Sequence, residues 1–291
     1  MSKRLPKILT VLACVAFIVL AFLSPQDFIN NSKNGIRLFA FNVLPILFPF
    51  FFITGLLVEL DLFKHKKLQH IGIISMSFLA GSPTSARILS QLYLRGDITR
   101  EQAIKTATYT STTSPIFIIA TLGASLYQDI QLGIIIFIAH ISGAVINGLF
   151  FGFVAKTSPA AEIPKPQYKI PTTEPSVSDA ITKSLHSAIQ NILAVGGLIV
   201  IFFIASTQLP LPVAAILEMT TGAFRAEAVT DGIWRVIIAC SIVTFGGMCV
   251  AMQSFVFLRT FRMPVRFYFL YKATHTFFAV TILLLLLLLP I

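Results

Sequence analysis

Apolar residues fall into eight long runs along the chain, separated by short polar or basic stretches. The runs cover residues 8–24, 35–60, 71–94, 104–127, 130–155, 186–208, 232–258 and 267–289. A helix needs roughly 20 apolar residues to cross the hydrocarbon core of a bilayer, and most of these runs approach or exceed that length. The pattern therefore predicts an all-α, polytopic membrane protein.

The composition agrees with a protein whose main partner is the lipid bilayer. Of 291 residues, 56% are hydrophobic and 12% are charged, whereas a soluble domain carries about 25% charged residues. The net charge of +10 fits the excess of Lys and Arg in cytoplasmic loops. No basic run is interleaved with aromatic residues, as single-strand binding needs, and the three cysteines have no metal-ligand spacing. We expect no nucleic-acid partner, bound metal or cofactor.

Basic residues at the start of the chain predict its orientation. Lys3, Arg4 and Lys7 precede the first apolar run and place the N-terminus in the cytoplasm. No small-x-small cleavage site follows that run, so we interpret 8–24 as an uncleaved helix. The chain is thus predicted to be a multi-pass membrane protein with its N-terminus in the cytoplasm.

The run 71–94 is predicted to be a re-entrant hairpin. The stretches on either side of it, 61–70 and 95–105, are both basic and should both be cytoplasmic. The run is also interrupted at Gly81–Ser85, which leaves two limbs too short to cross ~30 Å of hydrocarbon. Non-helical backbone at that depth is tolerated only where protein or a watery cavity covers it.

A Pro- and Ser/Thr-rich stretch over 156–183 divides the chain. We expect a cytoplasmic linker there, preceded by an N-terminal helix and loop (1–34) and a first half (35–155), and followed by a second half (184–291). The first segment of one half runs inward and that of the other runs outward. Opposed halves with paired helix breaks are typical of inverted-repeat transporters.

Matching breaks support two inverted-repeat halves with broken and re-entrant helices. The pair Pro45 and Pro49 in the first half corresponds to the pair Gly196-Gly197 in the second. The interruption Gly81–Ser85 is echoed by Phe245–Met248. Proline and glycine both weaken helices, so these positions are expected to be breaks.

Two interpretations of 232–258 stay open. Symmetry favours a second hairpin, entering from the outside, and we prefer it slightly. The basic residues Arg259, Arg262 and Arg266 favour a spanning segment with its end in the cytoplasm. The side on which the C-terminus lies depends on this choice.

The break at Gly81–Ser85 is the first candidate site. A helix that starts there presents free N–H groups and the positive end of its dipole, and the hydroxyls of Ser82, Thr84 and Ser85 add donors. The alternative is a capped break without a ligand. Arg87 is either a cation for the solute or a side chain that reaches toward the membrane surface.

The second candidate is the hydroxyl-rich stretch from Thr106 to Pro115. Such a stretch is costly against lipid and should face protein or water, either as a solute path or as interhelical hydrogen bonds. Pro115 has no N–H, which frees the Ser111 carbonyl for a cation or a polar solute. His140 shares a face with small residues, so we expect a packing stripe in which His140 is a satisfied partner rather than a proton relay.

The second half offers an acid and a further break. Glu218 lies in an apolar run, where an ionisable residue is a functional candidate, or else in an external loop. Lys272 and His275 are equally an interfacial anchor or a site. The predicted solute-binding residues of both halves are Gly81, Ser82, Pro83, Thr84, Ser85, Arg87, Gln91, Thr110, Thr113, Ser114, Asn191, Glu218, Thr220, Gly246, Gly247 and Gln253.

Several short motifs occur in an order that resembles a known family. They are Asn42–Phe50, Gly81–Arg87, Gln91–Tyr93, Ser114–Ile118, Leu217–Gly222 and Gly246–Gln253. The chain resembles the sporulation integral membrane protein YlbJ family, whose members carry nucleoside-recognition "Gate" domains. The resemblance implies two Gate-like halves and a transport or gating role.

By analogy with Gate-domain proteins, these observations predict a membrane transporter or gated permease of a bacterial plasma (inner) membrane, for a small polar solute that is anionic or nucleoside-like. A coupling ion and an oligomeric state are left open. The alternative is a non-transporting scaffold, which the resemblance would place in the formation of the spore envelope (cortex or coat). The sequence holds no nucleophile–base pair, metal cluster or phosphate-binding loop, so we expect no catalytic residues and no enzyme.

Overall fold

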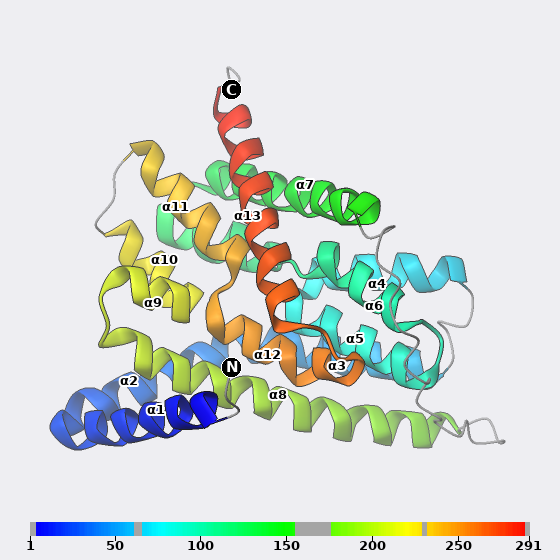
Figure 1. Cartoon of the computed structure of the whole chain (residues 1–291), viewed down its shortest axis with the longest axis horizontal. Helices are drawn as coiled ribbons and strands as arrows, with labels where there is room; N and C mark the ends of the chain where they lie inside the picture. Colours follow the sequence, from blue (N-terminus) through cyan, green and yellow to red (C-terminus); the bar gives the residue numbers. More distant parts are fainter. Residues whose placement is uncertain (1–3, 61–65, 155–175, 229–231, 289–291) are drawn as a thin grey trace.

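The computed structural model describes residues 4–60, 66–154, 176–228 and 232–288 (Figure 1). Within these ranges the chain forms helices and no strand. Five helical stretches are long and apolar enough to cross a bilayer: Pro25–Glu59, Ile130–Gly152, Val177–Thr207, Gly232–Phe261 and Val265–Leu287. The predicted all-α, polytopic membrane fold is confirmed.

The chain begins with α1 (Arg4–Leu23) and α2 (Pro25–Arg37), which lie side by side (Figure 1). Apolar side chains of α1 such as Leu12 and Phe22 are exposed, as suits contact with lipid. From α2 the helical path runs on into α3 (Leu44–Glu59).

The prediction that Pro45 and Pro49 break this segment was wrong. The π-helical turn η1 (Leu38–Val43) joins α2 to α3, and the Leu44 N–H bonds to the Phe39 carbonyl five residues back. This wider turn lies directly before Pro45 and changes the helical register without interrupting the path. Pro49 lies inside α3.

Residues Gly196 and Gly197 do not break their helix either. They lie inside α8 (Val177–Thr207), which is continuous. A Cβ on Gly196 would be 2.5 Å from the ring of Phe39, so this glycine admits an aromatic ring instead of ending a helix. Residues 177–183 of the predicted linker belong to α8, and 155–175 lie outside the described residues.

The first hairpin consists of α4 (Lys66–Ala80) and α5 (Ser82–Arg95), joined at Gly81. The two helices pack on each other, and the start of α4 and the end of α5 lie at the same end of the molecule (Figure 1). Gly96 ends α5 with a left-handed turn (φ 79°) in which its N–H bonds to the Tyr93 carbonyl. The structure has the predicted hairpin shape here.

A broken helix follows each hairpin. In the first part of the chain α6 (Arg100–Thr110) leads through an extended stretch to η2 (Ile116–Tyr127), and α7 (Ile130–Val154) comes next. After α8 come a second hairpin, a second broken helix and a last long helix. These elements are α9 (Leu211–Leu217), α10 (Met219–Glu227), α11 (Gly232–Phe245), α12 (Gly247–Leu258), η4 (Arg259–Phe261) and α13 (Val265–Leu287).

The preferred interpretation of 232–258 as a hairpin was wrong. Helices α9 and α10 pack on each other as the second hairpin, whereas α11 and α12 run on in one general direction (Figure 1). Arg100, at the start of α6, donates to the carbonyls of Phe261 and Arg262 at 3.0 and 3.1 Å. The end of 232–258 therefore lies beside the turn that follows the first hairpin. The break at Gly81 corresponds in element order to Glu218, between α9 and α10.

Long helices from the two parts of the chain pair in opposite directions. A Cβ on Gly35 would lie 3.3 Å from Val200, and one on Gly55 would lie 3.4 Å from Ser184, so α2–α3 and α8 are antiparallel. Helices α7 and α13 form the other long pair. In Figure 1, α8 with α2 and α3 lies below, α7 lies above, and the hairpins and broken helices lie between them.

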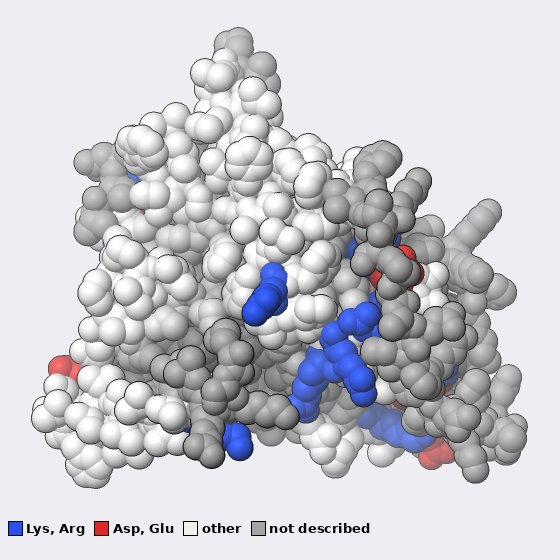
Figure 2. Space-filling view, in the orientation of Figure 1, with Lys and Arg blue, Asp and Glu red and all other residues white. Residues whose placement is uncertain are grey.

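Basic side chains gather toward one end of the molecule. On the face drawn in Figure 2, most of the Lys and Arg side chains gather near the end of α12 and the turn between α5 and α6. Arg95, Arg100, Arg259 and Arg262 belong to this end by their positions in the helices. Much of the rest of this face is uncharged.

Candidate solute-binding cavity

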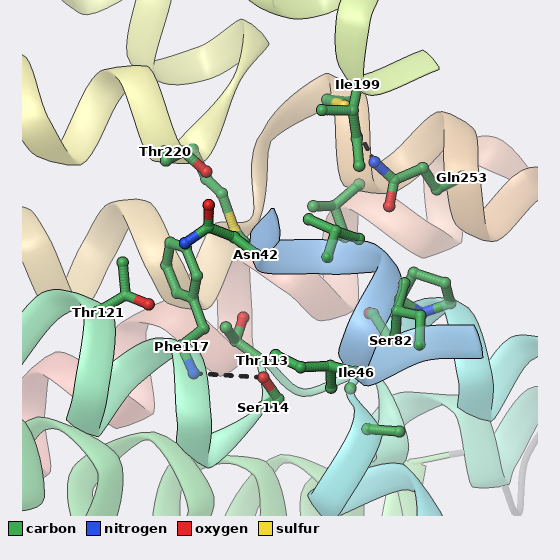
Figure 3. Close-up of a pocket in the computed structure, with 18 of the residues that line it drawn as sticks. Asn42, Ile46, Ser82, Thr113, Ser114, Phe117, Thr121, Ile199, Thr220 and Gln253 are labelled. Atoms are coloured by element: carbon green, nitrogen blue, oxygen red, sulfur yellow. Dashed lines mark hydrogen bonds between the residues drawn. The ribbon is translucent and has the colours of Figure 1, made fainter. Parts of the chain in front are cut away.

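A cavity of about 110 Å³ lies where the hairpins and broken helices meet (Figure 3). One water molecule takes roughly 10–15 Å³ of such a volume, so the cavity can hold several waters or a small solute. Its walls come from η1, the start of α3, both hairpins, both broken helices and α8. The lining residues are Leu38, Asn42, Val43, Ile46, Leu47, Ala80, Gly81, Ser82, Pro83, Thr112, Thr113, Ser114, Phe117, Thr121, Ile199, Glu218, Met219, Thr220, Cys249, Val250 and Gln253.

The tip of the first hairpin touches the first broken helix. Gly81 has φ 86° and ψ −174°, and a Cβ there would be 3.2 Å from the Ser114 nitrogen and 3.3 Å from the Thr112 oxygen. Only glycine fits both the dihedral angles and the close approach. The α4–α5 turn is thus held directly against residues 112–114.

Helix α5 begins at the cavity without a side-chain cap. Pro83 lies in its first turn, and Ser85 N–H bonds to the Gly81 carbonyl. The hydroxyls of Ser82 and Thr84 are buried and have no hydrogen-bond partner among the described residues. An unpaired buried hydroxyl costs free energy, so the cavity end of α5 can accept a polar partner.

The extended stretch after α6 is held from behind by α7 and α13. The Lys272 ammonium donates to the Ser111 carbonyl at 3.1 Å, and the Thr113 N–H donates to His140 Nε2 at 2.9 Å. The Thr113 hydroxyl donates to the Val243 carbonyl at 2.7 Å. The Ser111 carbonyl, which we expected to be free for a cation or a polar solute, therefore already accepts a hydrogen bond from Lys272.

The second hairpin presents a carboxylate. Glu218 is 4% exposed, and its two oxygens accept from the Thr220 and Thr221 N–H groups at 2.9 and 2.7 Å, which caps α10. Glu218 is the one charged side chain among the described residues that line the cavity. The interpretation of Glu218 as a residue of an external loop is thus excluded.

A second close approach joins the second hairpin to the second broken helix. Gly246 and Gly247 have φ of 81° and 72°, and a Cβ on Gly247 would be 2.9 Å from the Ile216 carbonyl oxygen. This contact matches the one between Gly81 and residues 112–114. On α12, Gln253 is 4% exposed and donates to Cys249 Sγ at 3.1 Å.

The structure brings half of the predicted site residues to the cavity. Those that line it are Gly81, Ser82, Pro83, Thr113, Ser114, Glu218, Thr220 and Gln253. The others lie close by or elsewhere, namely Thr84, Ser85, Arg87, Gln91, Thr110, Asn191, Gly246 and Gly247. Ser85 and Thr110 donate within their own helices, to the carbonyls of Ser82 and Thr106.

Arg87 has neither of the predicted roles. It is buried, and its guanidinium donates to the Phe51 carbonyl, to Thr54 Oγ1 at 3.2 Å and to Ser187 Oγ at 3.1 Å. It also lies over the Phe51 ring, 5.0 Å from the centroid. Asn191 donates to Ser187, so this group fastens α5 to α3 and α8.

The site prediction missed Asn42, Thr112, Phe117, Thr121 and Cys249 among others. Asn42 stood out in the sequence as an amide within an apolar run, and its position in η1 turns it to the cavity. The positions of Phe117 and Thr121 follow from the π-helical path of η2.

The predicted packing stripe of α7 is present, since a Cβ on Gly148 would be 2.7 Å from Tyr109.

The fold and the cavity define a polytopic α-helical membrane protein whose hairpin tips and broken helices enclose a partly polar site. The chain is similar to the sporulation integral membrane protein YlbJ of Bacillus subtilis (strain 168), with 26% identity over 235 residues, or 68% of this chain. The resemblance inferred from the ordered motifs is confirmed. The match spans 56% of the length of that relative. No protein-family model matches the chain, and no solved structure matches it.

Proposed function

We propose that the protein is a membrane transporter or gated permease for a small polar solute that binds in this cavity. The observation that carries the proposal is the position of the cavity, where two hairpin tips and two broken helices meet. Irregular backbone within a membrane protein is tolerated where it is covered by protein or lines a polar cavity. Transporters with inverted repeats bind solutes at such breaks.

The lining favours a neutral solute over an anionic one. Glu218 supplies negative charge, and no described Lys or Arg lines the cavity. Ser82, Asn42 and Gln253 supply neutral polar groups, and Phe117 belongs to an apolar wall. A solute with hydroxyl or amide groups and one apolar face, such as a nucleoside-like compound, fits this combination.

The element order supports two halves of opposed orientation. Each half has a long helix, a hairpin, a broken helix and another long helix, and the long helices pair antiparallel. The two tip-to-break contacts, at Gly81 and at Gly247, would then be gates toward opposite sides. Opening one of them at a time gives alternating access.

Uptake into proteoliposomes tests the proposal. A panel of labelled neutral nucleosides, polyols and small anions is offered to the wild type and to the variants Ser82→Ala and Gln253→Ala, reconstituted in equal amounts. Ser75→Ala is the matched control, because Ser75 is exposed on the same hairpin and bonds only within its helix. We expect uptake of a neutral solute that falls in both cavity variants and stays at the wild-type level in Ser75→Ala. Equal uptake in all four proteins would end the proposal.

The orientation is also a proposal. The basic end of the molecule would be cytoplasmic, in a bacterial inner membrane, with the N-terminus on the same side. Cysteines introduced for Glu101 and Arg262, with the native cysteines replaced, should then react with a membrane-impermeant thiol reagent only from the cytoplasmic side. Labelling from opposite sides would contradict the spanning path of α11 and α12.

The similarity to a sporulation protein supports a second candidate, a scaffold in spore envelope formation without transport. Under that function the cavity would be a packing defect between broken helices. Ser82→Ala and Gln253→Ala would then restore spore formation in a deletion strain as well as the wild type does. Failure of both variants at normal membrane levels would favour the transporter.

A further inference from the structure

Three basic side chains lie together directly behind the cavity. Lys272, His140 and His275 are each at most 1% exposed, and the two imidazole rings are 4.8 Å apart. His275 Nε2 donates to the His140 carbonyl at 2.9 Å. Through Lys272 and His140 the cluster holds the extended stretch at Ser111 and Thr113.

The contacts fix the protonation state of His140. A backbone N–H can only donate, so His140 Nε2 accepts from Thr113 with its lone pair and carries no proton. The ring proton is then on Nδ1, which donates to Thr244 Oγ1 at 3.0 Å. His140 is therefore neutral when it holds the Thr113 N–H.

We propose that His140 makes the cavity sensitive to protons, because a proton and the Thr113 N–H compete for the lone pair of Nε2. Protonation of His140 requires Thr113 to leave, and Thr113 lines the cavity. Acid therefore shifts the protein toward a state in which the stretch 111–114 is released from α7. That this shift couples solute flux to protons rests on the proposed function; the shift itself does not.

The groups around His140 favour release of the Thr113 N–H when His140 accepts a proton. Helix α13 contributes Lys272 and His275 near His140 and Tyr271 beside Ser111, and α11 contributes Cys240, which is 3.9 Å from Thr244 Oγ1. The stretch 111–114 contributes hydroxyl and backbone groups. No Asp or Glu of the described chain contacts the three basic residues. A positive charge buried on His140 beside Lys272 would have no carboxylate to offset it.

Lys272 also holds the stretch 111–114, through the Ser111 carbonyl. Pro115 leaves the Ser111 carbonyl without its helical N–H partner, and the ammonium occupies that position. The backbone of the stretch is thus fastened at one point by a donor of α13 and at another by an acceptor of α7, in addition to the bond from the Thr113 hydroxyl to Val243 of α11. Only the second contact is lost when His140 gains a proton.

Hydrogen–deuterium exchange of the 111–114 amides tests the proposal without a solute. Protection factors, taken relative to intrinsic rates at each pH, are measured by mass spectrometry in detergent micelles from neutral to acidic pH. His140→Gln keeps an acceptor for Thr113 but takes up no proton. His186→Gln is the matched control, because His186 is exposed on α8.

We expect protection of this stretch in the wild type and in His186→Gln to fall by up to about tenfold per pH unit, as uptake of one proton requires. Protection in His140→Gln should be independent of pH. The same fall in His140→Gln, or none in the wild type over the range in which it stays folded, would overturn the proposal.

A second measurement uses the wild type alone, so it tests the proposal even if the His140→Gln protein does not fold. Nitrogen NMR of histidine-labelled wild type should show one buried ring protonated only at Nδ1, which changes state together with the loss of protection. His275 donates from Nε2 and should carry its proton there, so the absence of any ring protonated only at Nδ1 in the neutral protein would refute the proposal. Failure of the transport proposal appears in uptake and leaves these readouts unchanged.

Discussion

Replacing Gly81 with alanine should show how firmly the first hairpin tip is held against the broken helix. The dihedral angles of Gly81, φ 86° and ψ −174°, lie in a region that is essentially limited to glycine and costs other residues about 1–3 kcal/mol. The added Cβ would also be 3.2 Å from the Ser114 nitrogen and 3.3 Å from the Thr112 oxygen. Both are backbone atoms of a stretch anchored to His140 and Lys272, so overpacking adds about 1–3 kcal/mol.

Gly96→Ala is the matched control, at the other end of the same helix. Gly96 also has a positive φ, 79°, but a Cβ there meets nothing within 4 Å. Its cost is the left-handed conformation alone, about 1–2 kcal/mol. The difference between the two variants therefore isolates the contact with residues 112–114.

Apparent melting temperatures in detergent measure that difference. Each kcal/mol corresponds to about 2 °C for a long chain. Gly81→Ala should thus lower the melting temperature by roughly 4–12 °C and Gly96→Ala by roughly 2–4 °C. Equal shifts would refute the reasoning, because they would show that the tip moves away from the broken helix at no cost.

Three further changes test other contacts. Glu218→Ala removes the cap of α10 and should cost about 0.5–2 kcal/mol, with Glu218→Gln losing less because one acceptor remains; a more stable Ala variant would contradict the capping role. Gly196→Ala places a methyl group 2.5 Å from the Phe39 ring and should cost about 1–3 kcal/mol. Its neighbour Gly197→Ala meets nothing within 4 Å and should gain up to about 1 kcal/mol; the reverse order would argue against this packing. Arg87→Lys should lower the melting temperature and leave solute affinity unchanged, and a selective loss of affinity would return Arg87 to the binding site.

The first hairpin could be predicted because two independent physical constraints coincided. The limbs on either side of Gly81 were too short to span the bilayer, and the basic stretches before and after the run both predicted the cytoplasmic side of the membrane. The second hairpin lacked this support. Its break at Glu218 lies between two short helices, and a basic residue, Arg225 in the last turn of α10, stands on one side only. Symmetry was therefore assigned to Gly246-Gly247 instead, which bend a spanning segment.

Glycine and proline were ambiguous because each serves two purposes. Gly81 ends a helix with a positive φ, whereas Gly196 stays helical and makes room for a ring from another segment. Pro49 lies inside α3 although proline usually ends helices. Which purpose applies depends on the neighbour that approaches the residue, and that neighbour is distant in sequence.

Contacts with residues distant in sequence also explain which predicted site residues line the cavity and which do not. Ser82 and Glu218 could be recognised locally, because each is a polar or acidic residue within an apolar run. Arg87 meets carbonyl and hydroxyl oxygens of α3 and α8, and the Ser111 carbonyl meets Lys272, 161 residues later in the chain. Only the tertiary fold shows that these strong polar groups are already satisfied by the protein.

The cavity wall has a consequence for biogenesis. Gly81 and Thr113 come from the part of the chain made first, whereas Glu218 and Gln253 come from the part made last. During synthesis the early hairpin enters the membrane before the opposite wall exists. The capacity to recognise a solute therefore arises only after α12 has been inserted, and two separately expressed fragments would have to reassociate to regain it.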